Sequence, residues 1–194
     1  MATIAELAHD GGFKAMSATE ICRLAHMSRG TFYELFGTSF AARRYAFAAA
    51  YERIFGPVPG AAGESGSWLE GLNSAIGVLF TGIAAEPLLA ELCLVHSASA
   101  PDEARGHDSQ AGIETMAGLL CGGREAGREV CGELYHDPPA LSEEYLARAI
   151  VSVTALRVGQ GEAATLPAHR EEMVMLAASS FLGAELAGPA CREI

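Results

Sequence analysis

The ten residues from Ser28 to Gly37 hold the side chains best suited to binding chemistry in this chain. Arg29, Thr31 and Tyr33 supply a guanidinium, a hydroxyl and a phenol, and these groups bind phosphate oxygens and base edges. At about 100° per residue of a helix, Gly30 falls on the side that carries no bulky apolar group. The segment therefore predicts a flat, polar helix face that can lie against a large partner.

The same segment has the sequence signals of a short helix with defined ends. Ser28 is a suitable N-cap, because its hydroxyl can accept from an amide of the first turn. Gly37 is suitable just after the helix, because glycine adopts the left-handed conformation easily. Phe32, Leu35 and Phe36 recur at helical spacing and predict one apolar stripe. If this stripe packs inward, the glycine-bearing side is left free to bind.

Two more helices are predicted upstream, and all three can share one small core. Ser17–Glu20 is a capping box ahead of an apolar run that ends near His26–Met27. An earlier helical stripe is formed by Ile4, Leu7 and Ala8. Two short helices joined by a tight turn are typical of the helix-turn-helix, whose second helix enters the major groove of DNA.

The stretch from Gly12 to Gly37 closely resembles the DNA-binding domain of the TetR (tetracycline-repressor-like) family. The shared pattern is glycine–phenylalanine, a capped helix with isoleucine and alanine, and a serine-started helix that ends in phenylalanine–glycine. The resemblance covers residues 1–55; the rest is similar in length, helical organisation and the segment 181–185. It implies an all-α fold, with a three-helix helix-turn-helix domain at 1–55 and a helical effector-binding and dimerisation domain at 67–194.

The resemblance also implies a homodimeric transcriptional regulator, expected to be a repressor, that binds a palindromic operator on double-stranded DNA. Hydroxyl groups and the phenol would anchor phosphates, Arg29 would bind a phosphate or a base, and Gly30 would allow close approach. Arg43 and Arg44 follow near the start of the next helix, where they either contact phosphate or pair with acids of the body. The residues expected to contact DNA are Ser17, Ser28, Arg29, Gly30, Thr31, Tyr33, Ser39 and Arg43.

Two positions depart from the family pattern. Ser39 stands where many relatives have a phosphate-binding lysine, so it keeps a hydroxyl without a charge. Glu34 lies on the exposed side of the predicted recognition helix, where relatives often have a basic residue or histidine. Its carboxylate either accepts from a cytosine amino group or is simply solvated. These departures bear on the strength of DNA binding.

The charge is unevenly distributed along the chain. The net charge of −11 is unfavourable for binding a polyanion. Residues 1–56 contain six basic and five acidic residues, a balance of +1, whereas residues 57–194 contain seven and nineteen, a balance of −12. The acidic excess therefore belongs to the part that is predicted to lie away from DNA.

Composition and spacing argue against several other classes of protein. The five cysteines (Cys22, Cys93, Cys121, Cys131, Cys191) are odd in number and widely spaced, which favours reduced thiols in a cytoplasmic protein over disulfides or a zinc site. No catalytic motif, metal-ligand spacing or cofactor loop is present, so we expect neither an enzyme nor a metal or cofactor protein. The most apolar stretch, 75–95, is interrupted by charges and a proline, and no signal-peptide pattern precedes it, so no membrane association is expected.

The remainder of the chain is predicted to be helical after a Pro/Gly linker at 56–66. Thr38 or Ser39 would cap a bridging helix that ends near Ile54. Later helices are expected at 68–85, 87–97, 109–134, 142–160 and 167–187, with a loop at 97–106. The last two of these, 142–160 and 167–187, are the expected homodimer helices. A row of small residues on the final helix, formed by Ala177, Ser180, Ala184 and Ala187, would let helices approach closely.

A small-molecule effector is expected to bind among the middle helices, and the apolar side chains there suggest an apolar or aromatic compound. Residues of these types are more often plain core than pocket lining, and a histidine such as His96 is more often a satisfied or exposed side chain than a ligand contact. The candidates are Trp68, Leu72, Phe80, Cys93, His96, Met116, Leu120 and Cys121. The alternative function is a TetR-like fold with weakened or lost DNA binding, which would bind a small molecule or a protein instead.

Overall fold

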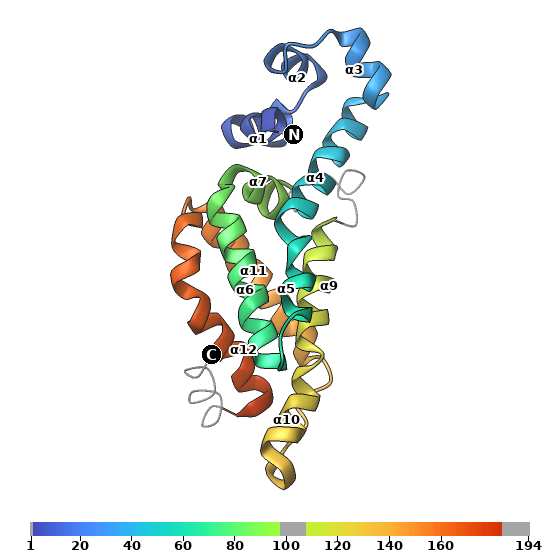
Figure 1. Ribbon diagram of the computed structural model, residues 1–194. Helices are drawn as coiled ribbons and strands as arrows, with labels where there is room; N and C mark the ends of the chain where they lie inside the picture. The colour runs from blue at the N-terminus through green and yellow to red at the C-terminus, as the bar shows by residue number, and fades with distance from the viewer. Residues whose placement is uncertain (1, 98–107, 184–194) are drawn as a thin grey trace.

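The computed structural model describes residues 2–97 and 108–183, and every regular element in these ranges is a helix. The expected all-α fold is confirmed. Figure 1 shows an elongated molecule in which three short helices form one end and a bundle of longer helices forms the rest. We call α1–α3 the head and the helices from α5 onward the body.

The head consists of α1 (Ala2–Ala15), α2 (Ala18–Leu24) and α3 (Arg29–Phe36). The apolar stripe predicted on the first helix is buried, as the head core requires. Helix α1 continues past Gly11 through a kink at Gly12, where φ is 64° and ψ is −162°. Glycine permits this left-handed backbone because it has no Cβ.

Both helices of the helix-turn-helix are capped by the serines that the sequence indicates. Ser17 accepts from the amide of Glu20 at 3.2 Å, although the Glu20 carboxylate binds Arg23 rather than closing the capping box. Ser28 accepts from the amide of Thr31 at 3.0 Å. Between the two helices His26 has a φ of 50°, which is an unusual left-handed conformation for a side chain of this size. The turn is therefore set by backbone conformation as well as by caps.

Helix α4 (Ser39–Phe55) runs from the head into the body, as Figure 1 shows. Thr38 rather than Ser39 is its N-cap and accepts from the amide of Ala41 at 3.0 Å. Lower down, the Tyr51 hydroxyl lies 2.6 Å from the Thr115 hydroxyl and ties α4 to the body. The predicted bridging helix is thus present.

The expected Pro/Gly linker is a helix, α5 (Pro57–Gly63), so the prediction of an irregular linker is wrong. Proline is well accommodated in a first helical turn, because its missing amide has no partner there in any case. Val58 is fully buried, and α5 packs closely against α6 (Trp68–Ala85). Only 64–67 remain as a turn between the two helices.

Helix α6 is a central core helix. Among the described residues it is the one helix that is long and apolar enough to span a membrane, with a mean hydropathy of 1.2. Its apolar face is buried, including Leu72, Ile76 and Phe80, as expected when an apolar helix packs within a bundle. It is followed by α7 (Pro87–Glu91) and by η1 (Leu92–His96), a π-helical turn.

The long helix predicted at 109–134 is divided into α9 (Asp108–Leu120), α10 (Gly123–Cys131) and the short turn η2 (Gly132–Leu134). Glycines lower helix propensity here, and one is also required by packing. A Cβ at Gly123 would lie 2.6 Å from the ring of Phe181. The predicted loop at 97–106 lies almost wholly outside the described residues.

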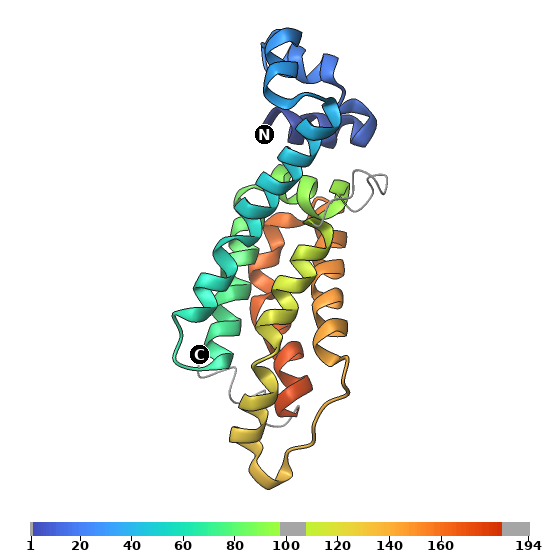
Figure 2. The same ribbon diagram turned by 90° about the vertical axis from the view of Figure 1, so that its right-hand side faces the viewer.

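The last elements are α11 (Ser142–Gly159), η3 (Ala163–His169) and α12 (Arg170–Leu182). The final helix begins at Arg170 rather than at Pro167, because the intervening turn is a 3₁₀ helix. Its predicted continuation to 187 falls outside the described residues. Figure 2 shows α4, α9, α11 and α12 extending along the long axis of the body.

The head contacts the body through α1, which packs against α7 and η1. Two histidines bind one carboxylate at this junction. His9 Nδ1 lies 2.7 Å from Glu91 Oε2, and His96 Nε2 lies 3.1 Å from Glu91 Oε1. Farther along, an ion pair between Arg53 of α4 and Glu86 at 2.5 Å ties the bridging helix to the body. Polar contacts therefore supplement the apolar packing that holds the head in place.

The His9–Glu91 pair predicts a pH-dependent junction. The hydrogen bond that His9 donates to the Glu91 carboxylate, helped by the charges of Glu91 and Asp10, raises the pKa of His9 above 6.5. A histidine whose pKa is raised by folding stabilises the folded protein. This stabilisation is fully present below the pKa of the histidine in the unfolded chain, and it is lost as pH rises through the pKa in the folded protein. We expect His9→Ala to lower the melting temperature at about pH 6 and to leave it almost unchanged at about pH 8.5. Thermal unfolding of both proteins at the two pH values measures this.

The matched control is His136→Ala, which removes an exposed histidine from the loop after η2. Its melting temperature should follow the wild type at both pH values. Equal losses for His9→Ala at both pH values would show that the contact is steric rather than ionic.

Candidate nucleic-acid interface

The aromatic side of α3 is packed inward. Phe32 is 0% exposed, and its ring centroid lies 5.3 Å from those of Phe36 and Tyr33. Phe36 is half-buried and contacts the ring of Tyr45 on α4 at 5.9 Å. These contacts fix the rotation of α3 about its own axis, so they also fix which side faces outward.

Gly30 lies on the outward side and is exposed. A Cβ at this position would meet only the hydroxyl oxygen of Ser28, at an ordinary distance of 3.5 Å. The fold itself therefore does not require glycine here. What the glycine provides is a flat outer surface at which another molecule can approach the helix backbone closely.

The prediction that Leu35 belongs to the buried stripe is wrong, because Leu35 is 64% exposed. At 100° per residue it lies about 60° from Phe32, on the side away from Phe36. The head core is narrow, so α3 buries only the sector that Phe32 and Phe36 share. Leu35 stands one turn after Thr31 along one edge of the outward face.

The other polar residues predicted on α3 are exposed together. Arg29 and Thr31 are exposed at its N-terminal end, and Tyr33 is 43% exposed with its ring nearly perpendicular to that of Phe32. The hydroxyls of Ser28 and Thr31 lie 2.9 Å apart, so the cap also orients Thr31. The helix N-terminus adds partial positive charge to this group.

Ser17 and Ser39 lie beyond α3 and are half-buried. Ser17 is occupied as a helix cap, whereas Ser39 begins α4 just after its cap. Each belongs to the first turn of a helix, where orphan amides favour an anion.

Arg43, which was expected either to contact phosphate or to pair with acids of the body, binds a backbone carbonyl of the head. Its Nη1 donates to the Met16 carbonyl at 3.1 Å, so it joins α4 to the turn before α2, and burial lowers its pKa. Arg44 is exposed, and its guanidinium carbon lies 5.9 Å from the centroid of the Phe40 ring. Sequence spacing alone cannot tell which of two adjacent arginines binds the head and which is exposed, because this depends on how α4 is rotated against the head.

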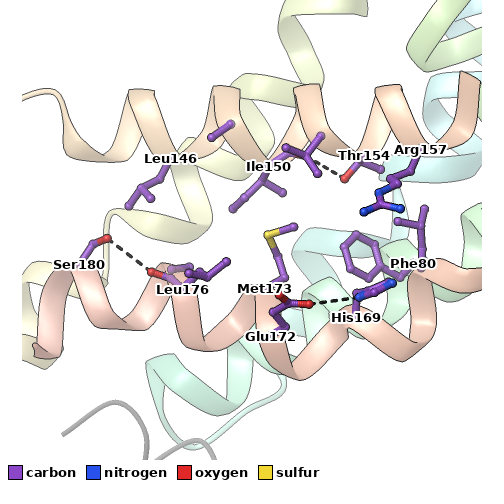
Figure 3. Close-up of a pocket in the computed structure, with 14 residues that line it drawn as sticks. Phe80, Leu146, Ile150, Thr154, Arg157, His169, Glu172, Met173, Leu176 and Ser180 are labelled. Carbon is purple, nitrogen blue, oxygen red and sulfur yellow. Dashed lines mark hydrogen bonds and ion pairs between the residues drawn. The ribbon is translucent and has the colours of Figure 1, made fainter. Parts of the chain in front are cut away.

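A second surface lies between α11 and α12, where a hollow of about 450 Å³ opens between apolar side chains. Figure 3 shows side chains of the two helices pointing toward one another across it, with Phe80 behind them. Of the eleven large apolar side chains exposed among the described residues, five lie on α11 and α12. We define the α11–α12 face as Ala149, Val153, Met173, Leu176 and Ser180.

The two described members of the predicted row of small residues both line the hollow. Ala177 is 1% exposed and packs inside the body, whereas Ser180 is exposed. Ala184 and Ala187 lie outside the described residues. The inward face of α12 packs against α6 and α10, and it carries Val174 and Phe181 as well as Ala177. Larger side chains remain on the outer face.

The predicted effector residues divide into three groups. Trp68 and His96 are hydrogen-bonded, Trp68 donating to the Leu119 carbonyl at 2.8 Å and His96 binding Glu91. Cys121 is exposed at the break before α10. The remaining five are buried core residues: Leu72, Phe80, Cys93, Met116 and Leu120. Of these five, Phe80 also lines the α11–α12 hollow.

Two solved structures of transcriptional regulators are similar to this chain. FadR from Bacillus subtilis, solved in complex with stearoyl-CoA, has a TM-score of 0.73 and 16% sequence identity over 92% of this chain and 96% of its own. The fatty acid degradation regulator FadR from Bacillus halodurans has a TM-score of 0.72 and 18% identity over 91% and 95% of the two chains. At such identities the likeness establishes the fold, and the TetR-like fold that the sequence predicts is confirmed.

Comparison at the level of sequence gives no such likeness, since no family model matches the chain and no curated protein matches it significantly. The helical arrangement is therefore retained where most side chains differ. The chain spans nearly the full length of both similar structures.

Proposed function

We propose that this chain is a ligand-responsive transcriptional regulator that binds double-stranded DNA through α3. The observation that carries the proposal is the outward face of α3, where Gly30 is exposed opposite a buried Phe32. The head lies at one end of the molecule, so this face is accessible to a long duplex (Figure 1). A capped helix of eight residues fits the width of the major groove.

The exposed groups around Gly30 have complementary roles. Arg29 binds a phosphate or a base edge, and Thr31 and Tyr33 anchor phosphates on either side of the helix. Ser17, Ser28 and Ser39 add hydroxyl and amide donors at helix starts. Arg44 takes the phosphate role that the sequence suggested for Arg43, because Arg43 is bound to the head's own backbone.

A homodimer would place two α3 helices on one duplex. The α11–α12 face is the proposed dimer surface, because Val153 and Leu176 are exposed at a hollow between the two helices that a second copy can fill. A two-fold dimer reads a palindrome whose half-sites are about one turn of DNA apart, roughly 34 Å. Repression by occupancy of such an operator is the simplest use of this geometry.

The proposed effector site lies in the body, and the proposed ligand is apolar. Stearoyl-CoA is the first compound to try, because one structurally similar regulator was solved with it. An effector can weaken DNA binding only if it binds more tightly to a state in which the two α3 helices are misplaced. Contacts of α1 with α7 and η1 supply a route from the body to the head.

The test is selection of bound sequences from a random duplex pool, followed by affinity measurements on the selected palindrome. Gly30→Gln should reduce affinity for it at least about tenfold, which is about 1.4 kcal/mol, because the new side chain separates α3 from the base edges. Affinity of the wild type should also fall steeply as salt rises.

Gly118→Gln is the matched control, since it makes the same change at an exposed helical glycine of α9 with open space around it. This control should bind as the wild type does. Unchanged affinity in Gly30→Gln would place the docking face elsewhere. A folded protein that binds no duplex even at low salt would favour the alternative, a regulator-like fold that binds a small molecule or protein.

A further inference from the structure

Glu34 occupies the middle of the outward face of α3. It follows Gly30 by one helical turn, and at 100° per residue both positions lie roughly opposite Phe32 and Phe36. Its side chain is exposed. Within the part of the chain that the structure describes, its carboxylate takes part in no ion pair or hydrogen bond. The surface that would dock on DNA therefore presents an uncompensated negative charge at its centre.

Such a charge opposes binding to a polyanion unless the bound state gives it a partner. None of the basic side chains described in the head, Lys14, Arg23 and Arg29, pairs with Glu34. Arg23 is paired with Glu20 at 2.9 Å, and Arg29 lies about 140° away from Glu34 around the helix. The partner must therefore come from the nucleic acid, as a hydrogen-bond donor on a base edge.

The major groove offers few donors to a group that can only accept. Guanine presents N7 and O6 and thymine presents O4, all of which are acceptors that repel a carboxylate. Adenine presents its N6 amino group beside the acceptor N7. Cytosine presents its N4 amino group with no acceptor of its own next to it, and a carboxylate that accepts from it is a recognised pairing.

We propose that Glu34 reads a cytosine at one fixed position of each half-site by accepting a hydrogen bond from its N4 amino group. This inference rests on the proposed function, since it assigns a specificity-determining residue to the same interface. The charge of the carboxylate weakens binding to DNA of any sequence, and the hydrogen bond to cytosine offsets this loss at sites that carry the cytosine. Discrimination therefore comes from repulsion at the wrong bases as much as from attraction at the right one.

Glu34→Gln tests the inference, because glutamine keeps the shape of the side chain and can pair bidentately with adenine N6 and N7. Sequences selected by the wild type should share a C·G pair at one position per half-site, and the variant should select adenine there. The Glu34→Gln variant should bind the palindrome selected by the wild type about tenfold more weakly than it binds the sequence that it selects itself. Its affinity for random duplex at low salt should rise several-fold.

The matched control is Glu64→Gln, which removes one negative charge from an exposed position after α5, away from the head. It should select the same palindrome as the wild type and show the same preference at the cytosine position. Both substituted residues are exposed, so neither variant should lose the folded state, and circular dichroism checks this.

The outcomes separate the two proposals. If the wild type enriches a palindrome and Glu34→Gln enriches the same bases with the same preference, the assignment of Glu34 is overturned and the proposed function stands. A general rise in affinity without altered base preference also overturns it, since Glu34 would then only repel. Absence of duplex binding by the folded wild type would overturn both.

Discussion

Replacing Phe32 with alanine should unfold the head or leave it marginally stable. Truncating a fully buried phenylalanine costs about 3–5 kcal/mol, because apolar contacts are lost and a cavity remains. Phe32 is 0% exposed and contacts Phe36 and Tyr33, so its removal would leave a cavity inside the core of the head. Hydrogen exchange of the α2 and α3 amides should lose its protection, while amides of α6 keep theirs.

Leu35→Ala is the matched control for this prediction. It truncates an apolar residue of the same helix that is 64% exposed, so its effect on stability should be within about 0.5 kcal/mol. A loss in Leu35→Ala equal to that in Phe32→Ala would mean that α3 is rotated about its axis. The outward position of Gly30, and the proposals that rest on it, would then be untenable.

Replacing Leu176 with glutamate should abolish the proposed homodimer and with it most of the affinity for a palindrome. Leu176 lies at the hollow between α11 and α12 and is 57% exposed, so the monomer should fold with the new charge in solvent. Two symmetry-related glutamates would be buried near each other in the dimer, and buried unpaired charges are strongly unfavourable. Loss of bivalent binding should reduce operator affinity by about 100-fold or more.

The matched control is Leu134→Glu, which makes the same change at an 81% exposed leucine in η2. It should alter neither the molar mass of the protein in solution nor its affinity for the palindrome. Sedimentation measures the molar mass of each variant, and titration with the palindrome measures affinity. If Leu176→Glu remains a dimer of wild-type mass, the α11–α12 face is not the interface. If it is monomeric but binds the palindrome as tightly as the wild type, DNA recognition does not depend on dimerisation.

Local sequence signals predicted the helix-turn-helix closely. Ser17, Ser28 and Gly37 mark helix ends in the structure as in the sequence. These signals are reliable because a cap satisfies amides within three residues of itself, and because glycine is the residue that adopts positive φ most easily. The bridging helix α4 was likewise predicted from its apolar spacing. Its N-cap is Thr38, one of the two residues that the sequence left open.

Predictions failed where a local signal had two readings. Proline and glycine at 56–66 suggested a linker, yet Pro57 begins a helix whose Val58 is buried. The helix predicted at 109–134 is broken before Gly123, against which the ring of Phe181 packs closely. In both cases a distant element decides: α6 packs against α5, and Phe181 of α12 leaves no room for a side chain at residue 123.

By itself the sequence determined the helical class, the caps and the polar chemistry of the segment 28–37, because each depends on neighbours along the chain. Tertiary structure alone decided which sides face outward. It left Leu35 exposed and bound Arg43 to the Met16 carbonyl. The physical reason is that the rotation of a short helix is fixed by the few rings it buries, and those contacts come from elements that a local pattern does not contain.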